Sequence, residues 1–425
     1  MVTGTTSCEV LVVGGGPAGA AAAFWLASLG RDVVVVEKKR FPREKTCGDG
    51  LTPRAVKQLD DMGLSDALTD YHRYDGLRAL AHGVTLEMRW PEHPDFPSHG
   101  YVVRRRELDQ LVADRAVKAG AHVVQGVEAR MPIVEDGLVR GAVVAATDNG
   151  SSSTSSIRAR YVVVADGSLS RFGRELRTTR NKAYPQGMAI RGYYESPLHD
   201  DPWIESCLDL RDREGKSLPG YGWVFPVGDG TINVGVGLLS TFKGWKGINT
   251  SHLIDEFAQT LPAHWEVTAD ASTGPPTGGR LPMAGSVSPK AGPNWLVIGD
   301  AAGSINPFNG EGIDYAYETG RSAAGFLDEA LTTGTGLPLR GYSEWLEREY
   351  SLYFRVARLF AQVIGRPALM RELTRVGMHS RSLMEWALRI MANLLRSEEL
   401  GPAEAVYRVI AKMVAPFPDP ARDVA

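Results

Sequence analysis

Short runs of β-branched and other apolar residues recur along the chain, and glycine-rich turns or helix-forming segments follow them. Residues 10–13 and 33–36 are continuous apolar runs, as is typical of parallel strands buried on both faces. Residues 20–29 lie between them, are rich in alanine, and predict a helix that ends at Gly30. Residues 161–165 form another such run. The pattern predicts an α/β core built on buried parallel strands.

Later segments predict other elements. Residues 187–194 and 231–238 predict strands of a second, antiparallel sheet. The positions 313, 317, 320, 324, 327 and 331 are spaced by three or four residues, which predicts the buried face of a helix. We expect a helical C-terminal region over 340–425, and the serine-rich tract 151–156 predicts a surface loop.

The composition is that of an ordinary folded protein. The 425 residues are 43% hydrophobic and 23% charged, the net charge is −3, and the length allows two or three domains. This charge gives no indication of nucleic-acid binding. Cys8, Cys47 and Cys207 are widely spaced, so they predict neither a disulfide framework nor a zinc site, and we expect no metal. The N-terminus lacks the basic region of a signal peptide, so we expect a cytoplasmic protein.

The turn after the first predicted strand contains a Gly-x-Gly-x-x-Gly motif. Gly14 permits a tight turn, Gly16 lets the backbone approach a pyrophosphate, and Gly19 lets the next helix pack on the strand. Glu37 ends the second strand, where its carboxylate can accept hydrogen bonds from ribose hydroxyls and would repel a 2′-phosphate. FAD or NAD is therefore favoured over NADP. The residues assigned to the turn are Gly14, Gly16, Pro17, Ala18 and Gly19.

A second glycine motif indicates that the nucleotide is a flavin. Asp300 directly follows the apolar run 295–298, where its carboxylate can accept hydrogen bonds from ribityl hydroxyls. Gly310, Gly312 and Ile313 open the helix described above, whose N-terminus would direct positive charge and free N–H groups toward the isoalloxazine. Two distant motifs that would hold opposite ends of one cofactor predict FAD and redox chemistry.

Two further residues are candidate FAD contacts. Arg105 precedes Leu108-Asp109 in a segment similar to the Arg-x-x-Leu-Asp that opens a helix next to the flavin in such enzymes. The alternative is a solvated arginine in the basic run 104–106. Residues 122–127 predict a strand, and the backbone near its last residue, Val127, is a candidate contact for adenine.

Together these pieces resemble the p-hydroxybenzoate-hydroxylase type of FAD-binding fold, which is related to the glutathione-reductase type. Residues 41–53 resemble the PxxKxCGDGL signature of the geranylgeranyl reductase family of FAD-dependent oxidoreductases. Residues 220–226 resemble the YxWxFP lipid-substrate motif of the same family, and the likeness runs through most of the chain. The resemblance implies that the cysteine and glycines of the first motif, Cys47, Gly48 and Gly50, lie against the flavin ring.

The resemblance also implies the reaction and the substrate. Members of this family hydrogenate isoprene double bonds of polyprenyl lipids, and the expected substrate here is one unit of the menaquinone side chain. The residues assigned to the substrate are Tyr221, Trp223, Phe225 and Pro226. The aromatic residues alternate, so in a strand they would project on one face. Such a face suits an apolar chain, although alternating aromatics also form ordinary core faces.

The chemistry of the alkene adds a requirement for a proton donor. An isolated trisubstituted alkene has no carbonyl group to accept charge, so one carbon must receive a proton as hydride reaches the other. Cys47 is the candidate donor or relay, because a thiol with a pKa of roughly 8.5 is protonated at neutral pH. The alternatives are a small residue that packs under the flavin and a redox thiol.

The motifs divide the chain into three parts. We expect a discontinuous FAD-binding domain at 1–75, 100–175 and 285–335, a substrate domain at 76–99 and 176–284, and a helical region at 340–425. Between residues 350 and 397 there are eight arginines and two acidic residues, with an apolar stripe that includes Leu383, Leu388 and Leu394. A basic amphipathic helix of this kind can lie on an anionic membrane, and the alternative is a helix packed on the body.

Two other functions fit the same scaffold. A flavin monooxygenase or halogenase would act on an aromatic or polyketide substrate, but halogenases carry a WxWxIP motif where this chain has Tyr221 and Phe225. A flavin-binding lipid carrier would have no turnover. The sequence shows no second nucleotide motif, so NAD(P)H, ferredoxin and a partner reductase all remain candidate electron donors.

Overall fold

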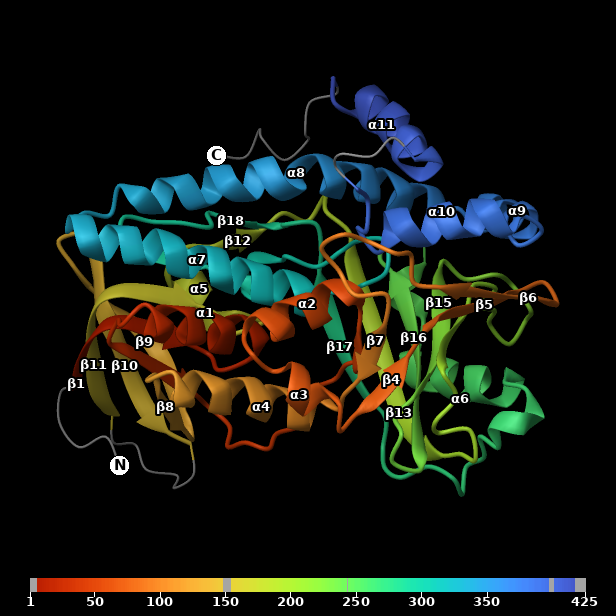
Figure 1. Ribbon diagram of the computed structural model, residues 1–425, viewed down its shortest axis with the longest axis horizontal. Helices are drawn as coiled ribbons and strands as arrows, with labels where there is room; N and C mark the ends of the chain where they lie inside the picture. Colours follow the sequence, from red (N-terminus) through yellow and green to blue (C-terminus); the bar gives the residue numbers. More distant parts are fainter. Residues whose placement is uncertain (1–5, 148–153, 243, 397–400, 417–425) are drawn as a thin grey trace.

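The computed structural model describes residues 6–147, 154–242, 244–396 and 401–416. Two large sheets stand at opposite ends of the molecule, and long helices run along one side of both (Figure 1). The first sheet contains the predicted buried parallel strands, and the second is largely antiparallel. The predicted α/β fold class is confirmed.

The first sheet carries the nucleotide motifs. It consists of β1 (Thr6–Val13), β2 (Val33–Glu37), β8 (His122–Gln125), β9 (Val127–Glu135), β10 (Leu138–Ala146), β11 (Thr154–Val164) and β19 (Trp295–Val297). The order is β8-β2-β1-β11-β10-β9, with β19 also paired to β11. The strands β8, β2, β1, β11 and β19 pair in parallel, so their carboxyl ends meet at one edge. That edge places the turns after β1, β2 and β19 close together.

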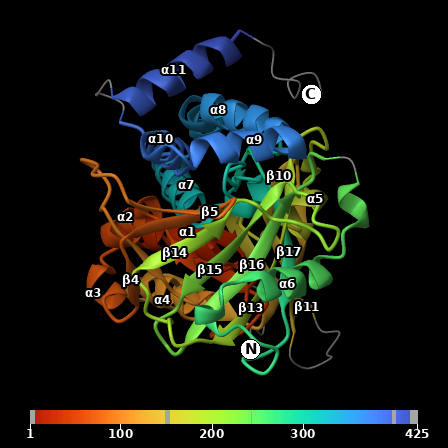
Figure 2. The ribbon, with the colours of Figure 1, turned by 90° about the vertical axis from the view of Figure 1, so that its right-hand side faces the viewer.

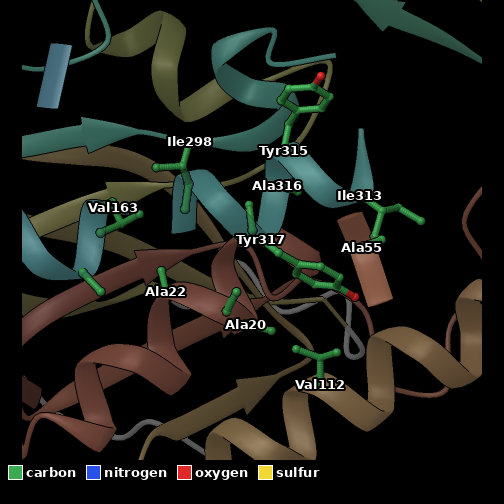
Figure 3. Close-up of a cluster of buried hydrophobic side chains, with 14 of the residues drawn as sticks. Ala20, Ala22, Ala55, Val112, Val163, Ile298, Ile313, Tyr315, Ala316 and Tyr317 are labelled. Carbon is green, nitrogen blue, oxygen red and sulfur yellow. The ribbon is translucent and has the colours of Figure 1, made fainter. Parts of the chain in front are cut away.

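Three helices cover one face of this sheet, namely α1 (Pro17–Ser28), α4 (Arg105–Lys118) and α7 (Ile313–Thr333). Figure 3 shows the small side chains Ala20 and Ala22 of α1 near Tyr317 of α7. A Cβ atom on Gly320 of α7 would lie 2.6 Å from the carbonyl oxygen of Ala18. The missing side chain therefore lets α7 pack closely on α1, which fixes the glycine motif before α7 relative to the glycine turn before α1.

The second sheet forms the other end of the molecule. It consists of β5 (Gly76–Ala81), β6 (Val84–Arg89), β13 (Gln186–Glu195), β14 (Trp203–Cys207), β15 (Gly220–Pro226), β16 (Thr231–Leu239) and β17 (Thr277–Pro282). The order is β17-β13-β16-β15-β14-β5-β6, and only β14 and β5 pair in parallel. Helix α6 (Thr250–Thr260) covers one face (Figure 2). The other face of β15 is left for the site described below.

Short elements connect the two ends. They are β3 (Gly50–Leu51), β4 (His72–Tyr74) and β7 (Gly100–Val102) in one small sheet, β12 (Thr179–Arg180) paired with β18 (Val287–Ser288), and the helices α2 (Pro53–Asp61), α3 (Ser65–Leu68) and α5 (Arg171–Glu175). The described residues also include three 3₁₀ turns, namely η1 (Trp245–Gly247), η2 (Ala263–Trp265) and η3 (Gly299–Ala302). The predicted serine-rich loop lies partly outside the described residues, and its last residues begin β11.

The C-terminal region is helical, with α8 (Pro338–Ile364), α9 (Pro367–Gly377), α10 (Arg381–Met391) and α11 (Pro402–Val414). The predicted apolar stripe is not an exposed face, because Leu388 and Leu394 are buried against the core of the small sheet and of β5 and β6. Of that stripe, Leu383 is exposed. Among the described helices, none combines the length and the apolar character that crossing a bilayer requires.

Candidate functional site

The glycine turn between β1 and α1 has the geometry that its motif predicts. Gly14 has a φ of +103°, and a Cβ atom there would lie 2.4 Å from the carbonyl oxygen of Ala165. A Cβ atom on Gly19 would lie 1.9 Å from the carbonyl oxygen of Gly14. Between them, Gly16 caps α1, and Pro17 and Ala18 form its first turn. The turn therefore presents bare backbone and a helix N-terminus at the edge of the sheet.

Glu37 and Arg43 flank this turn. The Glu37 carboxylate accepts hydrogen bonds from the backbone N–H groups of Gly15 and Lys39, each at 3.0 Å. The guanidinium of Arg43 lies 3.0 Å from Asp109, and its Nη2 would lie 3.5 Å from a Cβ atom on Gly16. The Nε atom of Arg43 is buried and lies 3.5 Å from Oε1 of Glu37, so the guanidinium forms ion pairs with both acids. A cation beside the glycine turn fits a pyrophosphate.

The structure gives Arg105 and Val127 different surroundings. Arg105 begins α4 and is buried, with two hydrogen bonds to Asp109 at 2.8 and 2.9 Å. It is therefore not the solvated arginine that the basic run allowed. Val127 begins β9 at the far edge of the first sheet and packs partly against its second core face. Its assignment to adenine stays a proposal.

The second glycine motif lies beside the first. Asp300 lies in η3, and its side chain is half-buried and accepts no hydrogen bond among the described residues. Its Oδ1 would lie 3.4 Å from a Cβ atom on Gly312, the residue that caps α7 before Ile313. Gly310 has a φ of +78°, which turns the chain toward the helix. A free carboxylate next to a helix N-terminus fits the hydroxyls and ring of a flavin.

The Cys-Gly-Asp-Gly segment touches the aromatic motif of β15. A Cβ atom on Gly48 would lie 3.1 Å from the ring of Phe225 and 3.4 Å from Nε1 of Trp223. A Cβ atom on Gly50 would lie 3.2 Å from the same Phe225 ring. The two motifs, about 175 residues apart in the sequence, therefore form one site, and larger residues at either glycine would crowd it.

The rings of Tyr221, Trp223 and Phe225 lie side by side on β15. Successive ring centroids are 5.9 and 6.2 Å apart. Tyr221 donates a hydrogen bond to the carbonyl oxygen of Asn309 at 2.6 Å, which ties the wall to the loop before α7. Pro226 ends the strand and is buried. We call these three rings the aromatic wall, and Tyr221 and Phe225 keep accessible surface.

Asp49 is a site residue that the sequence reasoning missed, although it lies inside the quoted motif. Its carboxylate is fully buried and accepts hydrogen bonds from Nδ2 of Asn233, the hydroxyl of Tyr193 and the N–H of Arg105. Burial raises the pKa of the Asp49 carboxyl, against the effect of these donors. Asn233 also donates to the carbonyl oxygen of Cys47 and accepts from Trp223. The second sheet therefore holds the Cys47 loop in place.

Cys47 is half-buried between these groups. Burial raises the pKa of its thiol, and the positive charge of Arg105 acts in the opposite direction. The thiol is therefore protonated at neutral pH. Arg43 and Asp49 could have been identified from their position within the motif at residues 41–53. Asn233 lies on the strand paired with the aromatic motif, and its spacing in the sequence is not distinctive.

The residues present fit FAD. The backbone turn beside Arg43, the carboxylate of Glu37 at the end of β2 and the free carboxylate of Asp300 would supply partners for the pyrophosphate, ribose and ribityl groups respectively. All three lie where the parallel strands end. The Cys-Gly-Asp-Gly segment and the aromatic wall follow on the side of the second sheet.

Known proteins resemble this chain over most of its length. A family model for an FAD binding domain matches residues 7–199. The menaquinone reductase of Mycolicibacterium smegmatis is 41% identical over 407 residues, covering 95% of this chain and 96% of the relative. Digeranylgeranylglycerophospholipid reductase 1 of Methanopyrus kandleri is 30% identical over 363 residues, covering 84% of this chain and 90% of the relative.

Solved structures show the same fold. A geranylgeranyl bacteriochlorophyll reductase-like protein from Thermoplasma acidophilum has a TM-score of 0.78 at 22% identity, with 96% of this chain and all of that chain covered. A flavin-dependent brominase has a TM-score of 0.73 at 18% identity, with 97% of this chain and all of that chain covered. FAD is therefore the cofactor, and the chain belongs to the geranylgeranyl reductase family of FAD-dependent oxidoreductases.

Proposed function

We propose that this protein is an FAD-dependent reductase that hydrogenates one isoprene double bond in the side chain of menaquinone. The 41% identity to a protein named menaquinone reductase supports the substrate. The observation that carries the proposal is the contact of the aromatic wall with Gly48 and Gly50, because it puts a surface for an apolar chain against the segment assigned to the flavin ring.

Different residues bind the cofactor and the substrate. Reduced FAD supplies the hydride. The glycine turn, Arg43 and Glu37 bind its adenosine and pyrophosphate end, and Asp300 and the N-terminus of α7 bind its ribityl end. The aromatic wall orients the prenyl chain and excludes water. Cys47, protonated at neutral pH, is a proton donor or relay, or else a small residue packed under the ring.

The division into domains supports the same proposal. The second sheet is built from residues 76–89 and 186–282, which fall within the proposed substrate domain at 76–99 and 176–284. The electron donor is NAD(P)H, ferredoxin or a partner reductase.

A peripheral contact with the inner face of the cell membrane is part of the proposal, because menaquinone is a membrane lipid. On α9 and α11, which also carry arginines, six large apolar side chains are exposed, and α10 packs against both helices (Figures 1 and 2). These side chains are Leu369, Leu373, Val376, Val406, Val409 and Met413. Helices that carry both exposed apolar residues and arginines can bind an anionic lipid surface.

Product analysis tests the function. The protein with FAD, an excess of chemical reductant and menaquinone in lipid vesicles is incubated without oxygen, and the quinone is analysed by mass spectrometry. The proposal predicts a gain of two hydrogen atoms in the side chain. A gain of one oxygen atom in the presence of O₂ would instead indicate a monooxygenase, and no change in the lipid would leave only a carrier.

A further inference from the structure

A buried group of charged side chains lies next to the aromatic wall, and the roles proposed above do not use it. Arg54 of α2 donates two hydrogen bonds to Glu318 of α7, at 2.7 and 2.8 Å. Asp314 lies 3.7 Å from Nε of the same guanidinium, and the charge of Arg54 also acts on Glu311. Arg54 and Glu318 already form a neutral pair. A negative charge on either of the other two carboxyl groups would therefore have no cation of its own.

Asp314 is a buried member of this group whose carboxyl group is protonated. It is fully buried, and neither carboxyl oxygen accepts a hydrogen bond from the described residues. Burial raises the pKa of Asp314, and the charges of Glu311 and Glu318 raise it further. An ionised carboxylate without donors is costly at such a position, so Asp314 holds a proton.

Glu311 is the member of the group that faces the substrate side. It keeps some accessible surface, and its carboxyl group hydrogen-bonds the Thr52 hydroxyl and Nδ2 of Asn309. Thr52 follows the Cys-Gly-Asp-Gly segment, and Asn309 accepts the hydrogen bond of Tyr221 at the end of the aromatic wall. Glu311 and Cys47 both lie close enough to Tyr221 that a negative charge on either would raise the pKa of the tyrosine. Besides Arg54, Asp314 and Glu318, the titratable groups around Glu311 are Tyr74, Tyr221, Tyr315 and Tyr353.

We propose that Glu311 is the acid that supplies the proton for the reduction of the double bond, and that Thr52 and Asn309 are positioning residues that hold its carboxyl group at the end of the aromatic wall. This proposal rests on the proposed function. Hydride with its electron pair adds to one alkene carbon and the proton of Glu311 adds to the other, so the π bond is replaced by two C–H bonds. FAD becomes oxidised, and the Glu311 carboxylate regains its proton from water.

The acidity of Glu311 suits this role better than that of Cys47. Burial raises the pKa of Glu311 to about 7, whereas burial raises the pKa of the Cys47 thiol above an ordinary value that is already higher. A general acid is most effective when its pKa lies near the working pH. The Cys47 thiol, which also lies close to Tyr221, can relay the proton or fill space. Glu311, not Cys47, then supplies the proton.

The test compares Glu311→Gln with Glu329→Gln, which makes the same change at an exposed position of α7, the helix that begins two residues after Glu311. Infrared spectroscopy of the protein without substrate measures the C=O band of protonated carboxyl groups. We expect a band that is present at pH 6, lost as the pH rises through about 7, and missing from Glu311→Gln alone. This readout tests the proton on Glu311 even if the proposed substrate is wrong.

Alkene reduction under the conditions above tests the use of that proton. We expect Glu311→Gln to bind FAD normally and to reduce the alkene about 100-fold more slowly at neutral pH, in the range typical of a lost general acid. Glu311→Asp should restore part of the rate together with its fall at high pH. A Glu311→Gln variant with the wild-type rate and pH profile would overturn the proposal, and so would a carboxyl band that does not change on substitution. If the wild type itself reduces no polyprenyl lipid, the proposed function fails instead.

Discussion

The side-chain amide of Asn233 donates a hydrogen bond to the buried carboxylate of Asp49 at 2.9 Å. Asn233 belongs to β16 of the second sheet, and Asp49 to the Cys-Gly-Asp-Gly segment beside the first. The same amide donates to the carbonyl oxygen of Cys47 at 3.0 Å and accepts from Trp223 at 2.9 Å. One side chain therefore joins the substrate sheet, the aromatic wall and the loop assigned to the flavin.

Replacing Asn233 with alanine should damage both stability and catalysis. It leaves three buried polar groups without their partner, and each such loss costs about 1–3 kcal/mol. Asn294→Ala is the control, because Asn294 also makes three hydrogen bonds, at 2.7–2.9 Å, but on the other side of the first sheet. Urea unfolding should show a loss of stability for both variants, whereas turnover per bound FAD should fall only for Asn233→Ala. Equal turnover in the two would contradict a positioning role.

Phe225→Ala should weaken substrate binding more than it weakens the fold. Removing a ring that contacts a prenyl chain forfeits about 1.5–3 kcal/mol of apolar burial, which raises the KM for the lipid roughly tenfold or more. Phe257→Ala removes a ring from the opposite face of the same sheet, where it packs against Gly222. Steady-state kinetics should show the change in KM for Phe225→Ala alone. The aromatic wall is only a core face if both variants leave KM unchanged.

Glu311 should make the stability of the protein depend on pH. Its folded pKa of about 7 lies above the ordinary value of 4.5, so the folded state binds more protons than the unfolded state between these values. The free energy of unfolding should therefore fall as the pH rises from 4.5 to 7, relative to Glu311→Gln, by up to about 3 kcal/mol. Denaturant titrations across this range measure the difference. Parallel pH curves for the two proteins would exclude the raised pKa.

Two glycines of α7 should respond oppositely to alanine. A Cβ atom on Gly320 would lie 2.6 Å from the backbone of α1, whereas one on Gly325 has no neighbouring atom within 4 Å. Gly325→Ala should therefore stabilise the protein by about 0.5–1 kcal/mol through helix propensity. Gly320→Ala should push α1 and α7 apart, lower the melting temperature and weaken FAD binding. Thermal unfolding and FAD affinity should be measured for both variants. Similar effects of Gly320→Ala and Gly325→Ala would contradict the close packing of α1 and α7.

Val376→Asp should reduce binding to membranes that contain anionic lipid. Val376 of α9 is 60% exposed within the arginine-rich end of the molecule, and Val134 of β9 is 56% exposed at the opposite end (Figure 1). Sedimentation with anionic vesicles at low salt should show weaker binding of Val376→Asp and unchanged binding of Val134→Asp. Wild-type protein that stays in the supernatant would remove the membrane contact from the proposed function.

Local sequence was sufficient for the nucleotide end of the site. The turn around Gly14 and Gly19 needs glycines at fixed positions a few residues apart, and the buried parallel strands need continuous apolar runs. Both features can therefore be recognised in the sequence. The stripe on α10 left two interpretations open, a membrane surface and a helix packed on the body. An amphipathic face shows that a helix has an apolar side, but not whether protein or lipid covers it, and here Leu388 and Leu394 are covered by protein.

The sequence by itself determined the fold class, the FAD motifs and the family, because each depends on spacing along the chain or on motifs within it. Tertiary structure alone decided which distant residues act together. Asn233 meets Asp49 only because two sheets pack against one loop, and Glu311 meets Arg54 only because α2 lies beside α7. Acidity and hydrogen bonding depend on what surrounds a group in space, and burial sets the pKa of Glu311 in a way that no neighbouring residue in the sequence reveals.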